Sequence, residues 1–77
     1  MSNAETYDPR NLIREAYRIE GIAAEDCRSI FFDWALGLKD GQDPVVAARA
    51  LLAHYADAPE DHPMTGLLRE AAERRAS

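Results

Sequence analysis

The chain has little of what binding and catalytic motifs are usually built from. Its single cysteine, Cys27, excludes a disulfide within the chain, and its four glycines are too scattered to form a phosphate-binding loop. No apolar run approaches the ~20 residues that a membrane-spanning helix needs. The N-terminus has no basic region followed by a long apolar stretch, so no secretory signal is expected. A lone thiol suits a reducing compartment, and we expect a cytoplasmic protein with no membrane contact.

Positive charge is also scarce. Nine Lys and Arg residues stand against fourteen Asp and Glu residues, which gives a net charge of -5. Proteins that bind nucleic acid derive much of their affinity from neutralised phosphates, so this balance argues against general nucleic-acid binding. It argues against adsorption to anionic lipid for the same reason.

The length of 77 residues predicts one small domain. We assign residues 8–77 to a single helical domain and expect residues 1–7, which are mostly polar, to be disordered. Ser2-Asn3-Ala4 within that segment resembles a cloning remnant. A chain of this size buries only roughly 60–65% of its unfolded surface, so oligomerisation is an economical way to enlarge the core.

Helical periodicity recurs along the chain, and no alternating strand pattern is seen. Asp8-Pro9 and Asp43-Pro44 are typical helix starts, in which the carboxylate caps backbone N–H groups and proline occupies the first turn. Pro63 begins another helix, with Asp61 or His62 as its cap. The sequence therefore predicts an all-α four-helix bundle with helices at about 9–20, 23–38, 44–56 and 63–75.

The 44–56 helix is apolar almost all round, which favours it as the central helix of the bundle. The 63–75 helix has only a narrow apolar stripe and is expected at the edge. Arg49 interrupts the apolar 44–56 helix. We expect it to form a structural ion pair, for which the candidate partners are Asp33, Asp26 and Glu20.

The 23–38 helix carries apolar residues on two sides. One continuous stripe, expected to face the core, consists of Ala23, Cys27, Ile30, Phe31, Trp34, Ala35 and Leu38. Phe32 and Leu36 are four residues apart and lie roughly on the opposite side. A helix in so small a protein should have one face buried in the core and one face exposed to solvent. A second apolar strip must therefore be covered by another helix, by a second copy of the chain or by a partner.

We therefore expect a protein–protein interaction module that homodimerises through this second strip or docks it onto another protein. The predicted interface consists of Phe32 and Leu36, flanked by Ser29, Arg28 and Glu25. The alternative surface is a stripe of Arg10, Arg14 and Arg18, spaced four apart, which would bind an acidic partner or nucleic acid. The structural interpretation of this stripe is a solvent-exposed helix face whose arginines pair with Glu15 and other acidic residues.

The sequence gives no sign of catalysis. Cys27 falls on the core stripe beside Asp26, which favours a buried structural thiol over a nucleophile. His54 and His62 are eight residues apart and match no paired metal-ligand spacing, so they are expected as surface or cap residues. We predict no enzyme activity, no cofactor, no metal and no small-molecule ligand.

Overall fold

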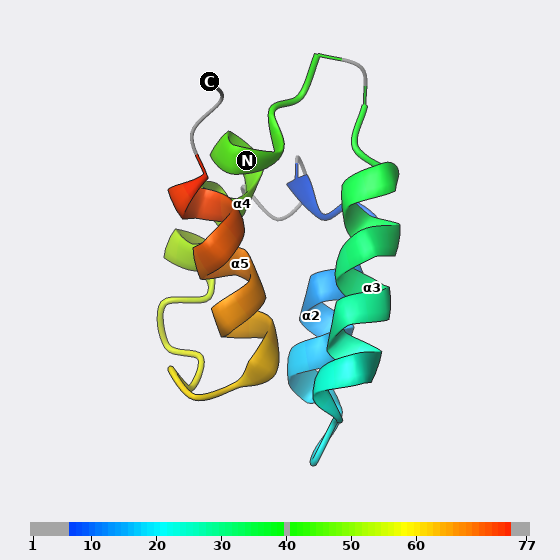
Figure 1. Cartoon of the computed structure of the whole chain (residues 1–77), viewed down its shortest axis with the longest axis vertical. Coiled ribbons are helices and arrows are strands. Elements are labelled where there is room, and N and C mark those ends of the chain that lie inside the picture. The colour runs from blue at the N-terminus through cyan, green and yellow to red at the C-terminus, as the bar shows by residue number, and fades with distance from the viewer. Residues whose placement is uncertain (1–6, 40, 75–77) are drawn as a thin grey trace.

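A computed structural model describes residues 7–39 and 41–74 of the chain. Four helices are present in these residues, and no strand is: α2 (Leu12–Arg18), α3 (Ala24–Leu36), α4 (Pro44–His54) and α5 (Pro63–Glu73). They pack together as a bundle (Figure 1), which confirms the predicted all-α fold. Residues 1–6 of the segment expected to be disordered lie outside the described residues.

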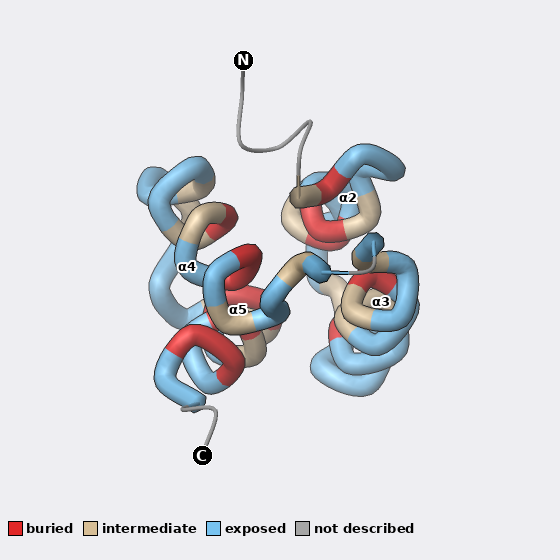
Figure 2. The backbone as a smooth tube through the Cα atoms, turned by 90° about the horizontal axis from the view of Figure 1, so that it is seen from above, coloured by how far each residue is buried: buried red, intermediate tan, exposed pale blue. Residues whose placement is uncertain are grey.

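The helix at the centre of the bundle is α5. It packs extensively against α4 and α3 and also contacts α2, whereas α4 packs chiefly against α5. Seen from above, α5 lies between α4 on one side and the α2–α3 pair on the other (Figure 2). The sequence prediction, with the 44–56 helix at the centre and the 63–75 helix at the edge, is therefore wrong.

The reason lies in the area that each apolar residue contributes. Four of the apolar residues of α4 are alanines, which carry little apolar surface: Ala47 and Ala48 are buried, but Ala53 faces water at small cost. Even its Val46 is 47% exposed. The narrow stripe of α5, in contrast, is buried along its length: Met64, Thr65, Leu68, Ala71 and Ala72.

The core draws on every helix. Its largest fully buried apolar side chains are Ile13 of α2, Leu51 of α4, and Met64 and Leu68 of α5. From α3 the core takes Cys27 and Trp34, as the main stripe predicted, with Phe31 half-buried against them. A single apolar cluster thus holds the bundle together.

Two of the three predicted helix starts are confirmed. Asp43 caps α4 with a carboxylate oxygen that accepts the Val45 N–H at 2.8 Å, and Pro44 occupies the first turn. His62 rather than Asp61 caps α5, since its Nδ1 accepts the Met64 N–H at 3.1 Å. An imidazole nitrogen that accepts this bond carries no proton.

The helix predicted at about 9–20 is α2, which begins only at Leu12. Asp8 still caps it, but from four residues before its first residue and across an intervening turn. Its backbone carbonyl accepts the Asn11 N–H and so closes a turn that contains Pro9. The turn places Asn11 at φ 58°, a left-handed conformation that asparagine tolerates better than most residues. Pro9 therefore belongs to a turn before α2 and not to the first helical turn.

The turn brings the Asp8 carboxylate beneath the N-terminus of α2. Its two oxygens accept the backbone N–H groups of Leu12, Ile13 and Arg14, at 2.8, 3.1 and 3.1 Å. Only 1% of Asp8 is exposed. A negative charge buried at a helix N-terminus, with three donors aimed at it, is stabilised by both the bonds and the helix dipole.

Arg49 has no carboxylate partner among the described residues. Its Nε donates instead to the backbone carbonyl of Ala72, at 3.1 Å, near the C-terminal end of α5. The predicted ion pair with Asp33, Asp26 or Glu20 is wrong because α4 packs on α5, which turns Arg49 away from the α2–α3 side of the bundle. The arginine satisfies a helix-terminal carbonyl in the manner of a C-cap.

We predict that Asp8→Ala destabilises the protein more than Asp43→Ala. The first change leaves three N–H groups, one buried and two part-buried, without their acceptor and should lower the free energy of unfolding by about 2–3 kcal/mol. The second removes one exposed cap, which costs about 1 kcal/mol. Urea denaturation followed by circular dichroism measures both, and equal losses would contradict the role assigned to Asp8.

Candidate functional site

The outward face of α3 carries the most conspicuous exposed apolar side chains. Phe32 is 57% exposed and Leu36 is 85% exposed, although both are large hydrophobic residues. Glu25, Arg28 and Ser29 are exposed on the same face of the helix. The structure thus brings the five residues of the sequence-predicted interface together on one surface, which we call the α3 strip.

Trp34 fixes the rotation of α3 that points Phe32 outward. Its indole Nε1 donates to the backbone carbonyl of Tyr7 at 2.6 Å, which holds the ring on the core side. The Phe31 ring packs against this indole, with centroids 5.5 Å apart. Phe31 also makes an edge contact with the Phe32 ring, at a centroid distance of 6.1 Å. Since Phe32 lies two residues from Trp34, about 200° around the helix, its ring must leave the core.

A groove runs beside the α3 strip, between α3 and α5. It consists of two adjoining cavities of about 230 and 190 Å³, and we call it the α3–α5 groove. Both cavities are lined by Arg28, Leu67 and Glu70. The larger also takes in Phe31, Phe32, Ala71 and Arg74, and the smaller takes in Ala24, Pro63 and Gly66.

Sequence reasoning missed the α5 side of this groove. Leu67, Glu70, Ala71 and Arg74 follow the spacing i, i+3, i+4, i+7, so they share one helix face. That spacing is readable in the sequence, but the sequence predicts the 63–75 helix at the edge of the bundle. A second face of an edge helix has no neighbour with which to form a groove.

The groove contains charges of both signs. The exposed residues Arg28, Glu70 and Arg74 lie at its rim, and no ion pair joins any of these three side chains to another described residue. The floor is apolar, formed by Leu67 and the half-buried Phe31. A surface with an apolar floor and unpaired charges at its rim is suited to binding another protein.

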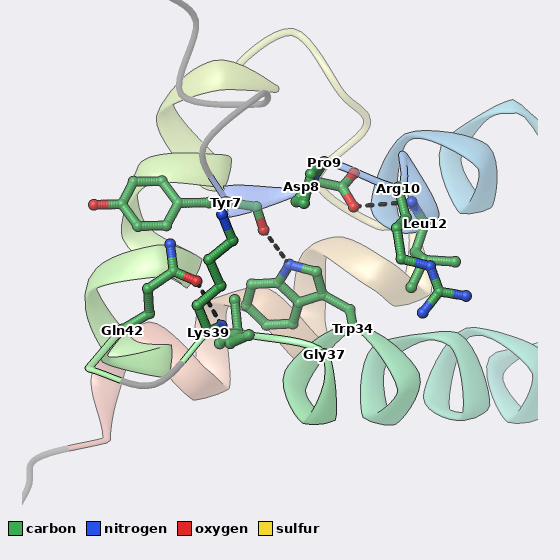
Figure 3. Close-up of a pocket in the computed structure, with 10 residues that line it drawn as sticks. Tyr7, Asp8, Pro9, Arg10, Leu12, Trp34, Gly37, Lys39 and Gln42 are labelled. Atoms are coloured by element: carbon green, nitrogen blue, oxygen red, sulfur yellow. Dashed lines mark hydrogen bonds between the residues drawn. The ribbon is translucent and has the colours of Figure 1, made fainter.

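A separate, smaller cavity lies at the C-terminal end of α3, beside the turn that precedes α2 (Figure 3). It is bordered by Tyr7, Asp8, Trp34, Lys39 and Gln42, among others, and measures about 40 Å³. This is little more than the space for one or two water molecules. The Tyr7 carbonyl and the Asp8 carboxylate already accept hydrogen bonds, so this region serves as a joint that anchors the N-terminal turn to α3.

The residues considered for chemistry do not form a reactive cluster. Cys27 is fully buried, and burial raises the pKa of its thiol, which favours the inert protonated form. His62 is occupied as a helix cap, and His54 is exposed at the end of α4. In the described part of the chain, no group of three His, Cys, Asp or Glu residues is arranged to hold a metal ion.

The arginine stripe is interrupted. Arg14 and Arg18 lie on α2, but Arg10 belongs to the preceding turn, so the three do not form one helical face. Arg18 approaches Glu15 at 4.0 Å, in agreement with the expected solvated face. Binding of nucleic acid or of an acidic partner at these arginines stays a prediction.

A cluster of polar and aromatic side chains joins α2, α4 and α5. The Thr65 hydroxyl donates its one proton to the Pro59 carbonyl at 2.9 Å, so the Tyr17 hydroxyl, 2.8 Å from Thr65 Oγ1, must donate to it. The Tyr17 ring contacts Tyr55 and His62 at centroid distances of 5.3 and 4.7 Å. Tyr55 differs, because its buried hydroxyl has no hydrogen-bond partner in the described part of the chain.

Comparison with known proteins adds no relative. No protein-family model, curated protein or solved structure matches the chain. Among the described helices, none is both long enough and apolar enough to cross a bilayer. The geometry and chemistry of the α3 strip and the α3–α5 groove therefore carry the functional proposal.

We predict opposite effects for two tyrosine-to-phenylalanine changes. Tyr17→Phe removes a satisfied hydrogen bond and should lower the free energy of unfolding by about 1 kcal/mol. Tyr55→Phe removes a buried hydroxyl without a partner and should leave that free energy unchanged or raise it by up to about 1 kcal/mol. Urea denaturation of the two variants compares them directly, and equal destabilisation would contradict the assignment of partners.

We also predict a loss of stability at alkaline pH. Burial raises the pKa of Tyr17 and of Tyr55, so the folded state favours the neutral phenols more than the unfolded chain does. This contribution is complete below the unfolded value of about 10 and is lost as pH rises through the higher folded-state values. The urea midpoint should therefore be lower at about pH 11 than at about pH 8, and the fall should begin only near pH 10. In the Tyr17→Phe, Tyr55→Phe double variant it should fall less, and an equal fall would assign the effect to other groups such as Cys27.

Proposed function

We propose that this protein is an interaction module that acts as a homodimer, and that the α3 strip is the self-association surface. The observation that supports this most directly is the pair Phe32 and Leu36, two large apolar side chains four residues apart and exposed on one helix. Exposed apolar residues are normal when scattered singly, whereas a neighbouring pair beside a groove favours an interaction site.

The size of the protein also favours self-association. Full burial of a side chain such as Phe32 or Leu36 contributes roughly 1.5–3 kcal/mol, and in a dimer each contributes twice. A standard interface buries about 800 Å² on each partner, roughly one seventh of this protein's 5422 Å² surface. The α3 strip together with the adjoining groove provides a continuous patch from which such an interface can be built.

The charge of the chain constrains the kind of dimer. Each copy carries a net charge of -5, so two copies repel one another and added salt screens that repulsion. Association driven by apolar burial is therefore expected to hold or strengthen as salt rises.

Since the single thiol, Cys27, suits a reducing environment, we propose the cytoplasm as the compartment.

We predict that the wild-type protein forms a dimer and that Phe32→Asp, Leu36→Asp converts it to a monomer with unchanged helix content. The changes put two negative charges into an apolar contact on each copy, where they would be desolvated without partners. Light scattering coupled to size-exclusion chromatography gives the mass, and circular dichroism gives the helix content.

The matched control is Val46→Asp, which introduces the same charge at a large exposed apolar residue on α4, away from the α3 strip. It should leave the mass of the dimer unchanged. A wild-type protein that remains monomeric at millimolar concentration would overturn the proposal. So would a double variant that still dimerises.

A further inference from the structure

We propose that the α3–α5 groove of each copy receives Phe32 of the other copy, with Glu70 of one copy facing Arg28 of its partner. This inference rests on the proposed homodimer and adds the surface that the α3 strip contacts. Phe32 stands at the edge of the larger cavity, so each copy carries a projecting ring beside a hollow. That combination is self-complementary, as a two-fold symmetric interface requires.

The cavity has the size and the lining for an aromatic ring. Its volume of about 230 Å³ exceeds the ~150 Å³ of a cavity that accommodates benzene. Its apolar lining consists of Leu67 and Ala71 of α5 and the aromatic ring of Phe31. Arg28 and Arg74 at the rim supply guanidinium groups, which bind favourably over an aromatic face.

Charge distinguishes this patch from the rest of the acidic surface. The residues that line the groove include two arginines and one glutamate, while the whole chain carries -5. Two copies that meet groove to groove therefore bring together surfaces that are less acidic than the chain as a whole. Arg28 and Glu70 occupy the region common to both cavities, and neither is paired within the described part of its own chain. A second copy supplies the opposite charge to each.

A charge-swap experiment tests this pairing between copies. Glu70→Arg and Arg28→Glu are made in separate chains, and each variant alone should dimerise at least about tenfold more weakly, because a symmetric dimer places the repulsive pair twice. When the two chains are mixed, the arginine introduced by Glu70→Arg in one chain faces the glutamate introduced by Arg28→Glu in the other. Native mass spectrometry should then show the heterodimer in clear excess over both homodimers.

Mixing separates contacts between copies from contacts within one copy. In the mixture each chain still carries two like charges in its own groove, so an Arg28–Glu70 pair within one chain would not be restored. The control is Glu73→Arg, which makes the same charge change at an exposed residue of α5 outside the groove and should not weaken the dimer. Circular dichroism verifies that each variant is folded, which is expected since all three positions are exposed.

The outcomes separate this inference from the proposed function. A wild-type monomer overturns both. A wild-type dimer whose mass is unaffected by Glu70→Arg and Arg28→Glu leaves the homodimer standing and overturns the groove as its contact surface. Variants that weaken the dimer singly but give no excess of heterodimer on mixing overturn the pairing of Arg28 with Glu70.

Discussion

The packing of α5 against the other three helices is the constraint on which the rest of the structure depends. The helix buries Met64 and Leu68 as its bulky residues, while Ala71 and Ala72 let neighbouring helices approach closely. A chain of 77 residues builds only one core, and α5 occupies its centre. Once it does, α4 is left with one covered face, and α3 contacts the bundle on one side only.

The N-terminal turn determines which side of α3 that is. Asp8 holds the start of α2 through three backbone bonds, and the neighbouring Tyr7 carbonyl accepts the Trp34 indole. Because these two contacts are made by adjacent residues, the capping of one helix and the rotation of another are coupled. The exposure of Phe32 is a consequence of this joint as much as of its own position in the sequence.

The polar clusters of the molecule differ in whether their bonding capacity is used. The Tyr17–Thr65–Pro59 chain, the His62 cap and the Arg49 bond to Ala72 are satisfied internally and explain how the helices are joined. The α3–α5 groove has apolar surface without cover and charges without partners in the described residues. A surface that combines uncovered apolar area with unpaired charges can bind a partner, whereas a structural cluster has its bonds satisfied within the protein.

Local chemistry is what the sequence by itself determined. Cap residues such as Asp43 act on N–H groups a few positions away, and helical periodicity fixes that Trp34 and Phe32 point to different sides, so the helices and the two apolar flanks of α3 could be predicted. The central position of α5, the partner of Arg49 and the contribution of Leu67 to the groove were decided only by tertiary structure. These depend on which helices meet, and helices pack according to the shape and area of their faces, which a count of apolar residues along the chain does not measure.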